Sequence, residues 1–228
     1  MEDDWFRSRE WAPDARDDFE KRLRRARPYK RAQYLRIKGL SLFEAGEVNG
    51  ARDLWQRVLD STEQLAGSEK AGALEHLADS FVGHASSAAE GYYRRLLHEY
   101  PSCNGTTHTQ HIKLAELLLD RGSPSDLRAA AALLTQWAPE THLPFPDAHY
   151  RWQLAAIRLA EATGDRAAAR EAARRALDLA ARGPVFSRHK QWVSSTLTRR
   201  RSGDCGVSPD SPRGLAPPVR SAGFATFH

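Results

Sequence analysis

The sequence predicts an all-α fold in which paired helices repeat along the chain. From about residue 30 to residue 181, apolar residues recur at helical spacing in segments separated by short turns. These segments read as helix, turn, helix four times, with about forty residues between equivalent positions. A repeat of that length is typical of a helical solenoid, in which each pair buries its apolar stripe against its neighbours.

A separate helix is predicted ahead of the repeats, within an N-terminal segment at residues 1–29. The helix begins at Pro13, since proline is favoured in the first turn, and runs to about Arg27, where Pro28 stops it. Three acid-first pairs at i,i+4 are expected to neutralise part of its basic half: Asp17–Lys21, Asp18–Arg22 and Glu20–Arg24. Three aromatic residues before the helix are expected to pin this segment onto the repeats: Trp5, Phe6 and Trp11.

The four repeat units cover about residues 32–60, 69–101, 107–138 and 147–181. Small residues in the middle of the first helices are separated by 39, 37 and 41 residues: Gly39, Ala78, Ala115 and Ala156. Core positions of the second helices are separated by 38, 41 and 39 residues: Trp55, Tyr93, Leu134 and Ala173. Aromatic residues at this spacing favour core packing over a ligand cage: Trp55, Tyr92, Tyr93, Trp137 and Trp152.

These units resemble tetratricopeptide repeats, whose motif has a small residue in the first helix, a glycine at the turn and alanine or aromatic residues along the second helix. Unit one matches at Gly39, Leu42, Gly46, Ala51, Trp55 and Val58. The other units match at Ala78, Phe81, Ala89, Tyr93, Leu96 and Pro101, at Ala115, Leu118, Gly122 and Leu134, and at Gly164, Ala169, Ala173 and Ala176.

The resemblance covers about residues 30–181 and implies a right-handed α-solenoid of about four repeats. The tetratricopeptide motif repeats about every 34 residues. Because the units of this chain are longer, enlarged loops are expected between the helices. A HEAT-like or other helix-pair solenoid is the alternative. The segments at residues 4–11 and 183–189 are also similar to repeat proteins of actinobacteria, a likeness that implies no activity.

In proteins of this resemblance, exposed positions of the first helices line a concave groove that holds a peptide or partner segment. Transferred position by position, the candidate groove residues are Gln33, Arg36, Glu75, Asp79, Thr109, Ile112, Glu116, Arg151, Leu154 and Arg158. Leu40 stands where the chaperone-binding relatives carry an asparagine, so their carboxylate clamp is not implied. The function predicted is a protein-interaction scaffold or regulatory adaptor whose partner and oligomeric state stay open.

No catalytic motif, metal site or cofactor site is predicted. The sequence lacks a G-x-S-x-G elbow, a phosphate loop, an H-E-x-x-H helix and a Rossmann fingerprint, so an enzyme is not the expected class. The best metal candidates have spacings that fit no familiar zinc pattern: His98, Cys103, His108 and His111. With only two cysteines and an acidic N-terminus without an apolar stretch, a cytoplasmic protein is expected.

The charge distribution provides the alternative function, nucleic-acid binding. The net charge is +5, but nine Lys and Arg residues and no acid fall within residues 21–38. A second basic block lies at residues 182–201, where a short capping helix is predicted. Residues 202–228 are rich in Ser, Pro and Gly and are predicted to be a disordered tail. Because a solvated helix face explains such blocks as well, and Arg174 has Asp178 at i+4, protein binding is preferred.

Overall fold

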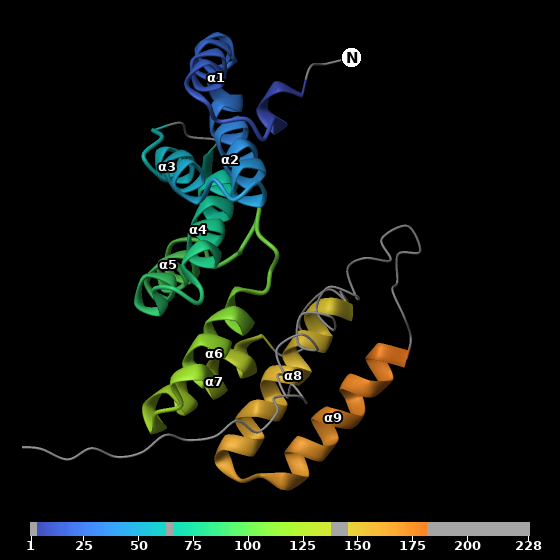
Figure 1. Cartoon of the computed structure of the whole chain (residues 1–228). Helices are drawn as coiled ribbons and strands as arrows, with labels where there is room; N and C mark the ends of the chain where they lie inside the picture. Colours follow the sequence, from blue (N-terminus) through green and yellow to red (C-terminus); the bar gives the residue numbers. More distant parts are fainter. Residues whose placement is uncertain (1–3, 63–65, 138–145, 182–228) are drawn as a thin grey trace, which may run out of the picture. The chain divides into compact units, whose positions relative to one another are not determined.

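The computed structural model describes residues 4–62, 66–137 and 146–181, and within these ranges the chain contains helices and no strands (Figure 1). The predicted all-α fold is confirmed. The helices are η1 (Trp5–Arg7), α1 (Pro13–Arg25), α2 (Pro28–Glu44), α3 (Val48–Leu59), α4 (Gly67–Phe81), α5 (Ser86–Glu99), α6 (Gln110–Arg121), α7 (Pro124–Gln136), α8 (Pro146–Thr163) and α9 (Arg166–Ala181). The predicted capping helix at residues 182–201 and the tail at residues 202–228 lie outside the described residues.

From α2 onward the helices form four consecutive pairs, as the repeat spacing predicts. The first helices α2, α4, α6 and α8 pack on the second helices α3, α5, α7 and α9, respectively. The second helices α3, α5 and α7 also contact the first helix of the next pair, and α2 contacts α4 just as α6 contacts α8. Neighbouring pairs therefore cover each other's apolar faces, while the right-handed sense of the solenoid stays a prediction.

Proline and glycine set several helix ends. Pro13, Pro28 and Pro124 occupy the first turns of α1, α2 and α7, where a missing backbone N–H costs nothing. Helix α1 ends at Arg25, whereas the sequence predicts an end near Arg27. The reason is that Arg27 precedes a proline and adopts an extended ψ of 133°. Gly122 ends α6 at a φ of +68°, and its N–H is bonded to the carbonyl of Leu118.

The contact between α2 and α3 depends on Gly39. A Cβ built at this position lies 2.8 Å from Cδ1 of Trp55, and closer still to its Nε1. The Trp55 ring is 1% exposed, and its Nε1 donates a hydrogen bond to the carbonyl of Arg36 at 3.1 Å. Only glycine allows the indole to lie this close to the helix backbone.

The small positions Ala78 and Ala115 are fully buried, as predicted, but the fourth one is displaced. Ala155 is buried on α8, whereas Ala156 is partly exposed. On α9 the buried alanines are Ala172 and Ala176, and Ala173 is partly exposed. The register predicted at Ala156 and Ala173 is therefore wrong by one residue, because the alanine-rich sequence offers adjacent candidates that only packing can separate.

The aromatic residues follow the core prediction. Trp55, Tyr93 and Trp137 are among the largest fully buried side chains, while Tyr92 and Trp152 pack against the core from its edge. Buried indoles need a hydrogen-bond acceptor, and Trp152 Nε1 donates to the carbonyl of Leu134 at 2.9 Å. These groups belong to the packing of the helices and leave no ligand cage in the part of the chain described.

The N-terminal segment is held against α1 and α2, as its aromatic residues predict. Phe6 stacks on Tyr34 with ring centroids 4.6 Å apart, and Trp5 meets the same ring at 5.2 Å. Lys38 on α2 is 1% exposed, and its Nζ donates to the carbonyls of Ser8 at 2.6 Å and Glu10 at 3.0 Å. Burial, opposed by the charge of Glu10, lowers the pKa of this lysine.

We expect Gly39→Ala to lower the free energy of unfolding by about 1–3 kcal/mol, the usual cost of overpacking a core. The matched control is Gly91→Ala in α5, where a Cβ meets no atom within 4 Å and the residue is exposed. That change should raise stability by about 0.5–1 kcal/mol through helix propensity alone. Urea unfolding followed by circular dichroism measures both, and equal stabilisation by the two changes would contradict the close contact with Trp55.

Candidate functional site

The predicted groove residues lie mainly on stripes of the first helices that face one another. On α6 the stripe contains Lys113, Glu116 and Asp120, and on α8 it contains Arg151, Leu154 and Arg158. Both stripes have the i, i+3, i+7 spacing that places side chains on one side of a helix. We use the name first-helix face for these two stripes together with Arg36 of α2 and Glu75 and Asp79 of α4.

Two ion pairs join α6 to α8 across this face. Arg151 binds Glu116 through both nitrogens of its fork, with Nε at 3.0 Å from Oε1 and Nη2 at 2.5 Å from Oε2. Arg158 Nη2 lies 2.6 Å from Oδ1 of Asp120. Burial by itself lowers the pKa of Arg151, but the hydrogen bonds and charge of Glu116 outweigh it, so the net pKa is raised.

A third connection joins α6 to α4 and is more deeply buried. Lys113 Nζ lies 2.8 Å from Oε1 of Glu75 and 2.7 Å from Oδ2 of Asp79. The hydroxyl of Tyr93 on α5 donates a short hydrogen bond to Asp79. Burial raises the pKa of Glu75, but Lys113 and the hydrogen bonds from Thr107 outweigh it, so the net pKa lies below its ordinary value. Glu75 is therefore ionised although it is only 1% exposed.

The connection between α2 and α4 involves Arg36. Its Nε lies 2.5 Å from Oε2 of Glu69, and its Nη1 lies 3.3 Å from Nε2 of His76. Burial, together with the positive charge of Arg36, lowers the pKa of His76 to about 4, so the imidazole is neutral at pH 7. Gln33 takes no part in these contacts and accepts a hydrogen bond from Lys30 at 3.2 Å.

The loop between α5 and α6 covers part of α4 on the first-helix face. A Cβ added at Gly72 would lie 2.8 Å from the carbonyl oxygen of Gly105, so loop and helix backbones are in close contact. Thr107 donates to Glu75 from its backbone N–H at 2.9 Å and also from its hydroxyl. Cys103 and His108 adopt left-handed backbone conformations, with φ of 52° and 58°. The chain itself thus occupies the part of the predicted groove beside Glu75.

Three predicted groove residues are corrected by this arrangement. Glu75 is buried beneath Thr107, and Ile112 is a core residue with no exposed area. Thr109 is also buried and precedes α6, which begins at Gln110 rather than near residue 107. The long loop between α5 and α6 shifts the start of α6 to Gln110, and the first turn of α6 faces the core. The other seven residues are partly exposed: Gln33, Arg36, Asp79, Glu116, Arg151, Leu154 and Arg158.

The ionic partners Glu69, Lys113 and Asp120, and the hydrogen-bond donor Thr107, were not predicted from the sequence. A usable signal was present, because opposite charges on successive first helices recur at nearly one repeat. The separations are 33 residues for Arg36–Glu69, 38 for Glu75–Lys113, 35 for Glu116–Arg151 and 38 for Arg158–Asp120. A search for complementary charges at the repeat spacing would have found all four.

The histidine and cysteine cluster considered from the sequence does not assemble in the described residues. Within residues 4–62, 66–137 and 146–181, no group of three His, Cys, Asp or Glu side chains is arranged to hold a metal ion. Cys103 is buried, and burial with the nearby charge of Glu75 raises the pKa of its thiol. Its thiolate form is thereby disfavoured.

None of the described helices combines the length and apolar character needed to cross a bilayer. No protein-family model and no curated protein sequence matches the chain. Among solved structures, the crystal structure of BtubC (BKLC) from P. vanneervenii is similar, with a TM-score of 0.54 and 16% sequence identity. The match covers 92% of this chain and 80% of that chain. At this identity the likeness concerns the fold alone.

We expect Lys113→Met to lower the free energy of unfolding by about 3–5 kcal/mol, because it leaves the buried carboxylate of Glu75 without its cation. Arg128→Met on α7 is the control, since Arg128 is exposed and the change should stay within about 0.5 kcal/mol. Thermal unfolding of both variants measures the difference.

The same variant has a predicted pH dependence. In the parent chain the pKa of Glu75 lies below its ordinary value, so its stabilising contribution is present above the unfolded-state pKa and is lost as the pH falls through the folded-state pKa. Without Lys113, burial is no longer opposed by an ammonium group and the pKa of Glu75 rises. The deficit of Lys113→Met should therefore shrink as the pH is lowered from about 7 to about 5. A deficit independent of pH would show that Glu75 carries no buried charge.

Proposed function

We propose that this chain is a tetratricopeptide-like scaffold that binds an extended segment of a partner protein on the first-helix face between α6 and α8. The proposed role is binding in the cytoplasm, without catalysis. The observation that carries it is a set of charged side chains that are fixed by ion pairs yet partly open to solvent: Glu116, Asp120, Arg151 and Arg158.

Fixed side chains favour recognition because little rotamer freedom remains to be lost on binding. Arg151 is held on two nitrogens by Glu116, and its side chain is still 36% exposed. Asp120 is bound by one nitrogen of Arg158 and is 66% exposed, so its second oxygen can accept a further donor. The surface between α6 and α8 thus offers both donors and acceptors in fixed positions.

The chemistry of this surface suggests what a partner segment contains. The acidic stripe of Glu116 and Asp120 lies beside the arginines of α8, and Leu154 lies between Arg151 and Arg158 on the same stripe. A segment with a basic and an acidic side chain on either side of an apolar one complements this pattern. The face of α4 is less suited, since Thr107 and Gly105 already cover it.

The test starts with selection of peptides from a display library on the full chain, followed by calorimetry with the enriched sequence. The decisive variant exchanges a pair, Asp120→Arg with Arg158→Asp, which keeps the ion pair and the net charge but reverses the surface pattern. Affinity should fall by at least about tenfold, because like charges then face each other. The thermal midpoint should stay close to that of the parent.

The matched control exchanges Glu20→Arg with Arg57→Glu, a pair between α1 and α3 that is also partly exposed and connects two helices. This exchange should leave the affinity for the selected peptide unchanged. If the library yields no enriched peptide, or if both exchanges have the same effect, the surface between α6 and α8 is not the binding site.

A further inference from the structure

The helix pairs that were expected to neutralise the basic block largely fail to form. Of the three i,i+4 pairs predicted in α1, only Asp18–Arg22 is present, at 2.8 Å. Glu20 turns instead to Arg57 on α3, with 2.6 Å between Oε1 and Nη1. Within the described residues, six cations of the block have no carboxylate at ion-pair distance: Lys21, Arg24, Arg25, Arg27, Lys30 and Arg31. Two of the three cations that were expected in ion pairs, Lys21 and Arg24, therefore have no carboxylate partner in the described residues.

Several of these cations are positioned by neutral groups, which orient them without cancelling their charge. Arg31 Nε donates to the carbonyl of Ala26 at 3.2 Å, and its Nη2 donates to the carbonyl of Arg24 at 3.0 Å. Arg27 donates to the hydroxyl of Tyr29 at 2.9 Å, and Lys30 donates to Gln33. The second half of α1 and the start of α2, residues 21–31, carry seven cations and no acid, and we call this part of the molecule the basic end.

Aromatic rings accompany the cations at the basic end. Tyr29 is 46% exposed, which is unusual among the large hydrophobic side chains described, and it lies between Arg27 and Lys30. Nearby, an open cavity of about 490 Å³ is lined by Trp5 and Tyr34 together with Lys21, Arg22 and Arg25, with Asp18 as its acid. Positive charge with accessible rings is the combination that holds single-stranded nucleic acids, whose phosphates need cations and whose unpaired bases stack.

Other polyanions fit this end less well. A membrane surface would require an apolar face to insert, yet Phe19 and Leu23, the large apolar residues of α1, are buried in the core. An acidic protein segment would use the cations but has no need of an exposed ring. We propose that the basic end binds single-stranded nucleic acid, with the cations on phosphates and Tyr29 stacked on a base.

The experiment measures fluorescence anisotropy of labelled single-stranded oligo(U) and oligo(dT), each about twelve nucleotides long, with the full chain. If about six phosphates are neutralised, the logarithm of the affinity should fall with the logarithm of salt at a slope of about −4. This slope corresponds to a loss of about 300-fold between roughly 50 mM and 200 mM salt. Stronger binding of either oligonucleotide identifies RNA or DNA as the preferred strand.

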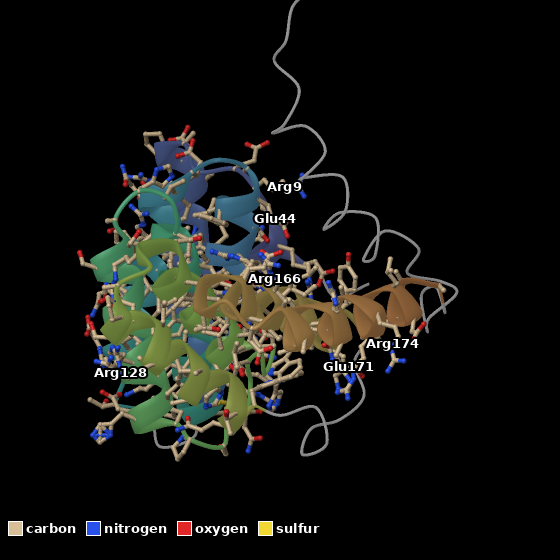
Figure 2. The ribbon with its side chains drawn as sticks, turned by 90° about the horizontal axis from the view of Figure 1, so that it is seen from below. Arg9, Glu44, Arg128, Arg166, Glu171 and Arg174 are labelled. Atoms are coloured by element: carbon tan, nitrogen blue, oxygen red, sulfur yellow. The ribbon has the colours of Figure 1, made fainter. Side chains whose placement is uncertain are left out.

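The test variant combines Lys21→Gln, Arg25→Gln and Lys30→Gln, and its salt slope should become shallower by about 2. The matched control removes the same charge elsewhere, with Arg128→Gln, Arg166→Gln and Arg170→Gln, and should bind like the parent. Figure 2 labels Arg128 and Arg166, which belong to α7 and α9. Equal losses in the two triple variants would overturn the proposal, because they would show attraction by net charge alone.

Tyr29→Leu separates stacking from charge. It should weaken binding by about fivefold or more while leaving the salt slope unchanged, since stacking of a base on a ring contributes about 1–3 kcal/mol. The proposal is overturned if Tyr29→Leu binds like the parent, or if duplex DNA, polyglutamate or phosphatidylserine vesicles compete as well as the single strand. The exchange at Asp120 and Arg158 should not affect the binding of the oligonucleotides. The peptide proposal and the nucleic-acid proposal are therefore tested independently.

Discussion

The buried carboxylate of Glu75 is the constraint on which the first-helix face depends. It lies on α4 with almost no access to water, and its charge is tolerated because Lys113 of α6 and Thr107 of the preceding loop both bind it. One side chain thus fixes the position of α6 relative to α4 and also the course of the loop between α5 and α6. The loop in turn lies over part of α4, where the carbonyl of Gly105 approaches Gly72.

From Glu75 outward, charge pairing follows the repeat. Arg36 with Glu69, Glu116 with Arg151 and Asp120 with Arg158 each connect a first helix to the next one. In a solenoid the apolar stripes specify that pairs stack, but alanine-rich stripes specify the register weakly. Directional pairs between Arg and carboxylates select one register among near equivalents. The same side chains, already ordered, are then available to a partner at their exposed edges.

The charges of the basic end are paired differently. Glu20 pairs with Arg57 of α3 rather than with Arg24 of its own helix, and a tertiary contact thereby replaces a local one. Arg24 thus adds to the cations without a carboxylate partner that lie in the same part of the chain as Tyr29 and the cavity that Trp5 lines. The α6–α8 surface carries paired charges of both signs, whereas this end carries cations in excess. The two surfaces therefore differ in the chemistry of the ligand that each can accept.

The sequence by itself determined the all-α fold, the four helix pairs, the roles of Gly39 and Trp55 and the attachment of the N-terminal aromatic residues, because these depend on periodicity, on helix-stopping prolines and on side-chain size. It also identified the stripes of α6 and α8 through residues such as Glu116 and Arg151. Only the tertiary structure decided that Ile112 and Glu75 face inward, that Ala155 rather than Ala156 is buried, and that Glu20 bonds to Arg57. Each of these outcomes depends on a contact between residues distant in the chain, and competing partners at helical spacing look alike until the helices are packed together.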